Sequence, residues 1–241
     1  MSYRVSAPAL PTNSAMPEDH TARQCLHRNF VAKLRPLPFQ YIWALYHQRG
    51  NKNEHNSISK DSDCLTVLTS SISTIAEFYQ VYNNFPWSSV QPRDSVHLFR
   101  SGVKPFWEDP ENAAGGRWTL KIRRSSFGPS NHDGFSQAQR TWEEICLIGC
   151  GGELQAALAG TGCKDAVLGM TFASKRTFVA ISIWMKFGDQ KVNWTEGGSV
   201  GEESDLLTWQ VLQKTVLERL SPELKPASST EYQWRQHREL H

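Results

Sequence analysis

The chain has 241 residues, which suits one domain with tails, because a single core need not divide until roughly 250–300 residues. Its 26 Lys and Arg residues against 24 Asp and Glu residues leave a net charge of only +2. This balance argues against a strong, sequence-independent grip on nucleic acid, so any contact with it should be local.

The cysteine pattern argues against a disulfide framework and against a metal site. The five cysteines form an odd number and include no CxxC pair, so we expect free thiols, no metal and no other cofactor. No apolar run approaches the ~20 residues of a membrane span, and the first residues lack the order of a signal peptide. We therefore expect no membrane contact and a cytoplasmic protein, with the nucleus left open as a second location.

The first segment, residues 1–33, is rich in Pro, Ser, Ala and charge and lacks periodicity, which is typical of a disordered tail. The folded domain is expected over residues 34–226, followed by a C-terminal tail at 227–241. Within the domain, short apolar runs predict six strands: FQYIWALYH, CLTVLTS, SVHLFR, RWTLKIR, AVLGMTF and VAISIWMKF.

The run RWTLKIR alternates cleanly between apolar and polar residues. Its apolar face is formed by Trp118, Leu120 and Ile122, and its other face by Arg117, Thr119, Lys121 and Arg123. Because successive side chains of a strand point to opposite faces, this pattern predicts a half-buried strand with a basic, solvated face.

Helical spacing first occurs after the second strand. Thr74 and Glu77 have the spacing of a capping box and precede an apolar stripe over residues 75–82. Thr141 and Glu144 repeat the spacing ahead of a second helix, which should end near residues 149–152.

A third helix is predicted from about residue 205 to a stop at Pro222. Polar segments at 125–139 and 188–204 are typical of flexible loops. Strands and helices do not alternate regularly enough for a parallel sheet, so the expected class is α+β, with an antiparallel sheet and helices on one face.

The most unusual segment is Val103–Ile122, VKPFWEDPENAAGGRWTLKI. Trp107 stands beside Glu108 in a loop, and a large flat apolar side chain has no use in a loop that only connects. The pair suits a flat ligand with two donors on one edge. The alternative is that Trp107 caps the edge of the sheet.

With STIAEFYQVYNNF, TWEEICLIG and the GMTF and ISIW strands, this segment resembles the cap-binding translation initiation factor family, eukaryotic initiation factor four-E. Within this family, the chain resembles the divergent fungal and cap-binding homologous-protein branch, although this match is looser. The resemblance covers residues 35 to 222. It implies a strongly curved antiparallel sheet, about three helices on its convex face, and an mRNA cap on the concave side.

The resemblance also implies a site for the cap base. The base, 7-methylguanine, is cationic and favours the face of a tryptophan, while its two donors suit one carboxylate. Trp107 and Glu108 would supply these groups, and Trp184 matches the ring that faces the methyl group. A tryptophan in the position of Trp184 is also a common core residue, and Trp43, Trp118 and Trp142 are assigned to packing.

Cations for the cap triphosphate are implied at Arg117 and Lys175, with Arg176 as a neighbour. Each has a simpler alternative, because Arg117 could solvate a sheet face, and the other two lie in a predicted hairpin turn. A third phosphate-binding lysine of the family falls on Ala180.

The family's second stacking ring is also missing from its expected position. Alignment without gaps places that position on Asp61, so the base would lose one stacking partner. Tyr46, His47 or His55 could substitute in space.

On the convex face, family members present a tryptophan to helical motifs of scaffold and repressor proteins. That position holds Tyr79 here, and it could equally be one more member of the apolar stripe of its helix. The other expected positions of this partner surface are Pro38, Ile75, Glu144, Leu147 and Gly151.

These patterns predict a monomeric, non-enzymatic mRNA cap-binding protein that acts in translation initiation or its repression. The chain has no Gly-rich phosphate loop, metal-ligand spacing or nucleophile elbow that would indicate an enzyme. The alternative is a protein-interaction module that keeps the fold and the partner surface but has lost most of its cap affinity.

Overall fold

The structure is a computed structural model that describes residues 38–50, 64–124, 133–159, 162–187, 190, 206–228 and 231–237. The tail predicted at residues 1–33 lies outside these ranges, as does nearly all of the polar segment at 188–204. All described residues belong to the unit of the chain that begins at Pro38. None of the described helices is long and apolar enough to cross a membrane.

In this part of the chain, seven strands form one open sheet in which every neighbouring pair is antiparallel. Their spatial order is β2-β1-β3-β5-β6-β4-β7. Their bounds are β1 Pro38–Gln48, β2 Leu65–Thr74, β3 Ser95–Arg100, β4 Gly116–Arg123, β5 Val167–Ser174, β6 Phe178–Met185 and β7 Tyr232–Gln236. The first six coincide with the apolar runs in the sequence.

Strand β4 shows why the two faces of the sheet differ. Trp118 and Leu120 are each 1% exposed and pack in the main core, as the alternation predicts. Arg117 and Lys121 project from the other face, where both line a cavity. The basic face that the sequence predicts therefore forms part of a concave surface.

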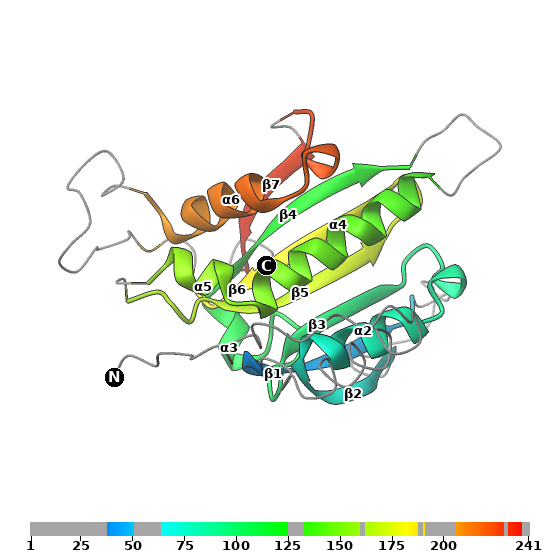
Figure 1. Cartoon of the computed structure of the whole chain (residues 1–241), viewed down its shortest axis with the longest axis horizontal. Helices are drawn as coiled ribbons and strands as arrows, with labels where there is room; N and C mark the ends of the chain where they lie inside the picture. The colour runs from blue at the N-terminus through cyan, green and yellow to red at the C-terminus, as the bar shows by residue number, and fades with distance from the viewer. Residues whose placement is uncertain are drawn as a thin grey trace, which may run out of the picture. The chain divides into compact units, whose positions relative to one another are not determined.

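Helices cover the opposite, convex face and lie in front of the sheet in Figure 1. The three longest are α2 Ile75–Asn84, α4 Asp133–Cys150 and α6 Thr208–Arg219. Shorter elements are α3 Pro110–Ala113, α5 Glu153–Ala157 and the 3₁₀ turns η2 Trp87–Ser89 and η4 Pro222–Leu224. The predicted class, a strongly curved antiparallel sheet with helices on its convex face, is confirmed.

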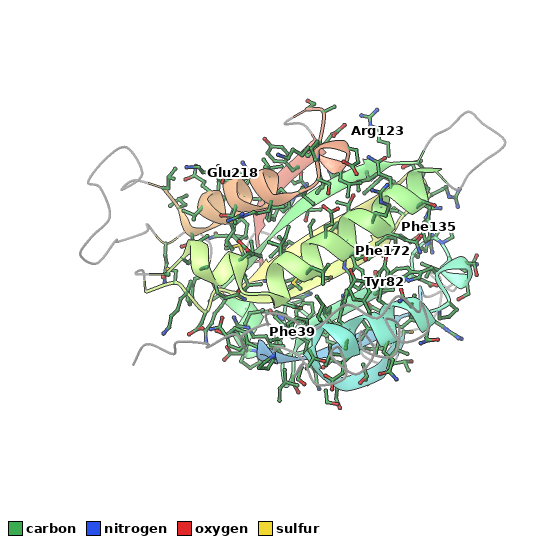
Figure 2. All side chains as sticks on the ribbon, viewed as in Figure 1. Phe39, Tyr82, Arg123, Phe135, Phe172 and Glu218 are labelled. Atoms are coloured by element: carbon green, nitrogen blue, oxygen red, sulfur yellow. The ribbon has the colours of Figure 1, made fainter. Side chains whose placement is uncertain are left out.

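Aromatic side chains fill the space between the sheet, α2 and α4 (Figure 2). The rings of Tyr82 and Trp142 stack with centroids 6.1 Å apart, and Phe172 of β5 contacts both Trp142 and Phe135. The tryptophans that the sequence assigns to packing are at most 1% exposed: Trp43, Trp118 and Trp142. This packing holds α2 and α4 on the sheet.

The start of α4 differs from the prediction. The sequence predicts a loop over residues 125–139, but α4 already begins at Asp133. Phe135 and Ala138 extend the apolar face of the helix upstream and pack against the core, which explains the earlier start.

The predicted capping box at Thr141 and Glu144 is accordingly wrong. Thr141 lies within the helix, where its hydroxyl donates to the Gln137 carbonyl at 2.8 Å. The Glu144 carboxylate instead accepts from the Ser221 amide at 2.9 Å and from the Ser221 hydroxyl at 2.6 Å. The Glu144 carboxylate thus joins the middle of α4 to Ser221, just beyond the end of α6.

The C-terminal tail predicted at residues 227–241 is wrong for residues 232–236, which form β7. This strand pairs with β4, with Trp118 opposite Trp234. The sequence YQWRQ gives a weak strand signal because it is short and only two of its residues are apolar. Tyr232 and Trp234 nevertheless alternate correctly and pack against the core.

The capping box at the start of α2 is confirmed and offers a test of the fold. Thr74 Oγ1 accepts from the Glu77 amide at 3.2 Å, and the Glu77 carboxylate accepts from the Thr74 amide at 3.2 Å. We expect Thr74→Ala to lower the free energy of unfolding by about 1 kcal/mol in chemical denaturation, because one helix donor loses its partner. Thr215→Ala, inside α6, is the control and should be neutral or slightly stabilising. An equal loss in both variants would contradict the assigned cap.

Candidate functional site

A cavity of about 530 Å³ lies on the concave face of the sheet. Alternate residues of the strands form its floor, and the loop that precedes α3 forms one wall. The residues that line the cavity include Gln48, Ser95, His97, Trp107, Glu108, Arg117, Thr119, Lys121, Thr171, Lys175, Ala180, Ser182, Trp184, Gln233 and Arg235.

Cross-strand pairing arranges the floor in three rows that run from β3 to β4 or β7. The first row is Phe99, Gly169, Trp184, Arg117 and Arg235. The second row is His97, Thr171, Ser182, Thr119 and Gln233. The third row is Ser95, Ala173, Ala180 and Lys121. The floor is therefore neutral under β3 and β5 and becomes basic at β4 and β7.

A chain of hydrogen bonds fixes the neutral half of the floor. The Trp184 indole N–H donates to Thr171 Oγ1 at 2.9 Å, so the Thr171 hydroxyl can donate to His97 Nδ1, also at 2.9 Å. His97 Nε2 then carries the ring proton and donates to Gln48 Oε1 at 3.3 Å. Burial lowers the pKa of His97 to about 3, with a smaller contribution from His47, so the ring is neutral at physiological pH.

The loop that carries Trp107 is held by the residues that follow it. Asp109 caps α3, since its carboxylate accepts from the Glu111 amide and from the Lys104 amide, each at 3.0 Å. The adjoining Glu108 is exposed and lines the cavity. The two neighbouring acids thus have different tasks, one in the loop and one facing the cavity.

Asn112 also holds the loop that carries Trp107. Its side chain is fully buried, and its amide donates to the carbonyls of Lys104 and Phe106 at 2.7 and 2.8 Å. The main-chain carbonyl of Asn112 accepts from His237 Nδ1 at 2.7 Å. The ring of His237 lies 4.7 Å from the ring of Trp184, so the loop, the end of the last strand and the cavity floor are linked.

Two glycines permit the close approach of β6, β4 and β7. A Cβ at Gly115 would collide with the Met185 carbonyl oxygen, and one at Gly116 with the Arg235 carbonyl oxygen and the Trp234 ring. The two consecutive glycines are therefore needed mainly for strand packing. It brings β7 against β4 at the level of Arg117.

The structure brings together most of the predicted ligand residues. Trp107, Glu108, Arg117 and Lys175 all line the cavity, and Trp107 is 39% exposed. Trp184 also lines it but is 5% exposed, so most of its ring serves the core, in line with the simpler alternative.

Arg176 is exposed in the turn between β5 and β6, next to Lys175, and does not line the cavity. Asp61 lies outside the described residues.

Three residues, Tyr46, His47 and His55, are the alternatives for the second stacking ring. Tyr46 lies on the cavity side of the sheet but is 8% exposed, packed against the small cluster that contains Trp184. His47 faces the helices, where its ring contacts Phe85 and its Nε2 lies 3.6 Å from Asp94 Oδ2. His55 is outside the described residues. Neither of the two described alternatives offers an open ring face to the cavity.

Several lining residues carry no signal in the sequence that would single them out. His97 and Thr171 are isolated polar residues in apolar strands, and only the sheet register reveals their pairing. Lys121 could be found, because it lies on the basic face predicted for its strand. Arg235 could not, because the sequence does not predict the strand that carries it.

On the convex face, the predicted partner residues keep some exposed surface. Ile75 is 48% exposed, and Tyr79 is half-buried against the rings of Phe78 and Tyr82. Burial raises the pKa of Tyr79, and a hydrogen bond to Glu143 of α4 raises it further.

Two further residues of this partner surface lie at the ends of elements, and Glu144 lies inside α4. Pro38 is exposed at the start of β1, and the Gly151 amide donates to the Leu147 carbonyl at 2.8 Å at the end of α4. Glu144 is bound to Ser221, as described above.

The chemistry of the cavity favours binding over catalysis. An exposed aromatic ring and a carboxylate at one wall can hold a flat ligand that carries donors, and the cations on β4, β7 and the β5–β6 turn can hold its phosphates. Among the described residues, no group of three His, Cys, Asp or Glu side chains could hold a metal ion.

A model of the family described as Eukaryotic initiation factor 4E matches residues 38–236, and the chain belongs to this family. The resemblance inferred from the sequence is thus confirmed at the level of the family, and the match includes β7. Because the family is one of translation initiation factors, the prediction that the chain is not an enzyme is confirmed as well.

Relatives in plants and animals are similar to parts of the chain. Eukaryotic translation initiation factor NCBP of Oryza sativa subsp. japonica is 26% identical over 179 residues, which cover 73% of this chain and 68% of the relative. Eukaryotic translation initiation factor 4E of Homo sapiens is 32% identical over 115 residues, 46% of this chain and 47% of the relative. The matched part is therefore about half of the human protein.

Two solved structures share the fold at 20% sequence identity. C. elegans eIF4E-3 in complex with the 4E-binding protein Mextli has a TM-score of 0.60 and covers 86% of this chain and 96% of its own. Ascaris suum eIF4E-3 with m7G cap has a TM-score of 0.58 and covers 84% and 92%. At this identity the likeness shows a common fold.

The role of Asn112 can be tested by substitution. Asn112→Ala leaves the Lys104 and Phe106 carbonyls without their donor, so we expect the free energy of unfolding to fall by about 2–3 kcal/mol. Amide hydrogen exchange in residues 104–109 should accelerate in the same variant. Asn84→Ala is the control, because this exposed amide bonds only to the Gln80 carbonyl in its own helix, and it should change stability by less than about 0.5 kcal/mol. Equally small effects in both variants would show that Asn112 does not hold the loop.

Proposed function

We propose that the protein binds the 7-methylguanosine cap of mRNA and acts in translation initiation or its repression. The observation that carries this proposal is the placement of Trp107 and Glu108 on the wall of a cavity whose floor becomes basic at β4. Family membership and the solved structure of a relative with m7G cap support the same ligand.

The cap base would bind at the Trp107 wall. Its positive charge is attracted to the negative face of an indole ring, and the 39% exposure of Trp107 leaves ring surface available. Glu108 would accept both donors of the guanine edge, while the Asp109 carboxylate is already used by the loop. Trp184 would contribute the small part of its ring that remains exposed.

The triphosphate would extend from the base toward cations on the floor. Arg117 lies above the Trp184 ring, with its guanidinium carbon 5.5 Å from the ring centroid, and it faces the same cavity as Lys175. We assign phosphate binding to these two residues. Arg176 would lie outside the cavity next to Lys175 and would attract the phosphates from solvent.

A partner surface on the convex face completes the proposal. Tyr79, Ile75 and Leu147 would receive an amphipathic helix from a scaffold or repressor protein, with Pro38, Glu144 and Gly151 at its border. The solved complex of a relative with a 4E-binding protein supports this kind of partner. We propose a cytoplasmic monomer that can also enter the nucleus.

The alternative function is a protein-interaction module of the same fold with little cap affinity. One observation favours it, since Trp107 is the only lining aromatic residue in the described part of the chain that is exposed. The position expected to supply the second ring holds Asp61, so a bound base would be stacked on one side only. We therefore expect weak cap binding in either case.

The base site is tested by Trp107→Ala and Glu108→Gln in fluorescence titrations with 7-methyl-GTP and GTP. Each change should abolish retention on a 7-methyl-GTP matrix, because loss of a stack costs about 1–3 kcal/mol and loss of a charged bidentate contact a similar amount. The wild type should prefer 7-methyl-GTP over GTP.

Glu111→Gln is the matched control, because its carboxylate pairs with Lys186 at 2.8 Å outside the cavity, and it should bind normally. A folded Trp107 or Glu108 variant with normal binding would remove that residue from the site. Equal, very weak responses of the wild type to both nucleotides would favour the alternative function.

The partner surface is tested with an amphipathic peptide that carries a tyrosine and, about one turn later, two apolar residues. Tyr79→Ala should weaken this peptide by roughly tenfold and leave 7-methyl-GTP binding unchanged, because a buried aromatic anchor carries much of a helix interface. Gln80→Ala, exposed on the same helix, should affect neither. Unchanged peptide binding by a folded Tyr79→Ala variant would assign Tyr79 to the core alone.

A further inference from the structure

The first row of the cavity floor ends in two arginines that stand directly opposite each other. Arg117 of β4 pairs with Arg235 of β7, and both side chains line the cavity. Side chains directly opposite in neighbouring strands lie about 4.5–5.5 Å apart at Cβ, and like charges in this position destabilise the sheet. The arrangement costs stability unless an anion lies between the two guanidinium groups.

Within the described ranges, neither Arg117 nor Arg235 forms an ion pair with an acid. The acidic residues with described charge contacts lie against other basic side chains, those of His47, Arg140, Lys186 and Arg219. Burial lowers the pKa of Arg117, and the charge of Arg235 lowers it further, so the pair is electrostatically strained in the ligand-free protein. A phosphate would bind both groups through charge-assisted hydrogen bonds.

The next two rows continue this surface away from the base site. Thr119 and Gln233 stand opposite each other in the second row. Thr119 is 8% exposed and its hydroxyl pairs with Ser182 Oγ at 2.9 Å, so the Gln233 amide is the neutral group that this row offers a ligand. Lys121 follows in the third row, opposite Ala180, so it supplies a cation beside the position where the family's third phosphate-binding lysine is missing. From Arg117 to Lys121 the strand advances about 13 Å, which is longer than a single phosphate needs.

We propose that Arg235, Arg117 and Lys121, with Thr119 and Gln233 between them, form a binding surface for the phosphodiester chain of the RNA nucleotides that follow the cap. We name this set the β4–β7 edge. The proposal rests on the proposed cap function in one respect, because the bound cap fixes where the RNA chain begins. The ability of the edge to bind phosphate does not depend on the cap.

Single-stranded RNA fits this surface better than an acidic peptide. Cations at both ends of the edge match successive phosphates of the chain, and the Gln233 amide between them matches a ribose hydroxyl, which both donates and accepts. The edge strand β7 has no further strand beyond it in the described part of the chain, so an RNA chain could leave the cavity on that side.

The test compares Arg235→Gln and Lys121→Gln with Lys225→Gln, which removes the same charge from an exposed residue that directly follows η4 and does not line the cavity. The probes are 7-methyl-GTP, GTP, a capped RNA of ten nucleotides, the same RNA without a cap, an acidic peptide of equal charge, and inorganic tripolyphosphate. Affinities are measured by fluorescence at two salt concentrations, and melting temperatures are measured with and without tripolyphosphate.

Arg235→Gln and Lys121→Gln should each weaken the capped RNA by about fivefold and reduce the salt slope of its binding by about 0.7. The ratio of affinities for 7-methyl-GTP and GTP should stay unchanged, because the base site is intact. Arg235→Gln should also raise the melting temperature of the ligand-free protein and reduce its stabilisation by tripolyphosphate, since it removes one member of the repelling pair.

Three outcomes would overturn the proposal. The first is equal RNA affinity in Arg235→Gln, Lys121→Gln and Lys225→Gln. The second is a loss of 7-methyl-GTP binding as large as the loss of capped RNA binding, which would assign these cations to the cap triphosphate alone. The third is an acidic peptide of equal charge that competes as well as the RNA.

Failure of the cap function would look different. The wild type would then bind 7-methyl-GTP and GTP equally, while uncapped RNA and tripolyphosphate would still depend on Arg235 and Lys121. That result would support the β4–β7 edge and reject the base site.

Discussion

Burial of one face of the sheet beneath α2, α4 and α6 decides which side chains remain for the cavity. Because a strand alternates its side chains, each residue buried under the helices forces its neighbour to the concave side. The full burial of Trp118 and Leu120 therefore fixes the positions of Arg117, Thr119 and Lys121 as firmly as any contact of their own. A shift of one residue in the pairing of β4 would exchange the tryptophan and the cations, and neither face could form.

The wall of the cavity depends on a second arrangement, in which distant segments meet. Asn112 holds the loop that carries Trp107, and His237 joins Asn112 to the ring of Trp184. The close approach permitted by Gly115 and Gly116 brings β7 into this contact. The loop and the last strand are thus joined into one support, and the base site and the β4–β7 edge share it.

The sequence predicts much of this fold because its main signals are local. Apolar runs identify six strands, and the Thr74 capping box marks the start of α2 correctly. The same pattern at Thr141 fails because Phe135 extends the apolar face of α4 upstream, and a cap requires that the preceding residues are not helical. Strand β7 is missed because its pairing partner, β4, supplies most of the reason for its conformation.

The residues of the candidate site also differ in whether a local sequence signal predicts them. Trp107 and Glu108 stand out because an exposed aromatic residue next to an acid is rare in a connecting loop. His97 and Thr171 cannot be inferred, since their roles arise only when the register of β3 and β5 places them side by side. The pairing of Arg117 with Arg235 cannot be inferred either, because it arises only when β7 pairs with β4, and the two residues are far apart in the sequence.

The neutral state of His97 has a consequence for how the cavity responds to acidity. Its ring proton is committed to Gln48 and its other nitrogen to Thr171, and burial keeps its pKa near 3. The floor beneath a bound ligand therefore neither takes up nor releases a proton from this ring between pH 5 and 8. Any acid-base titration that accompanies binding in that range must originate in the ligand itself or in groups other than this buried imidazole.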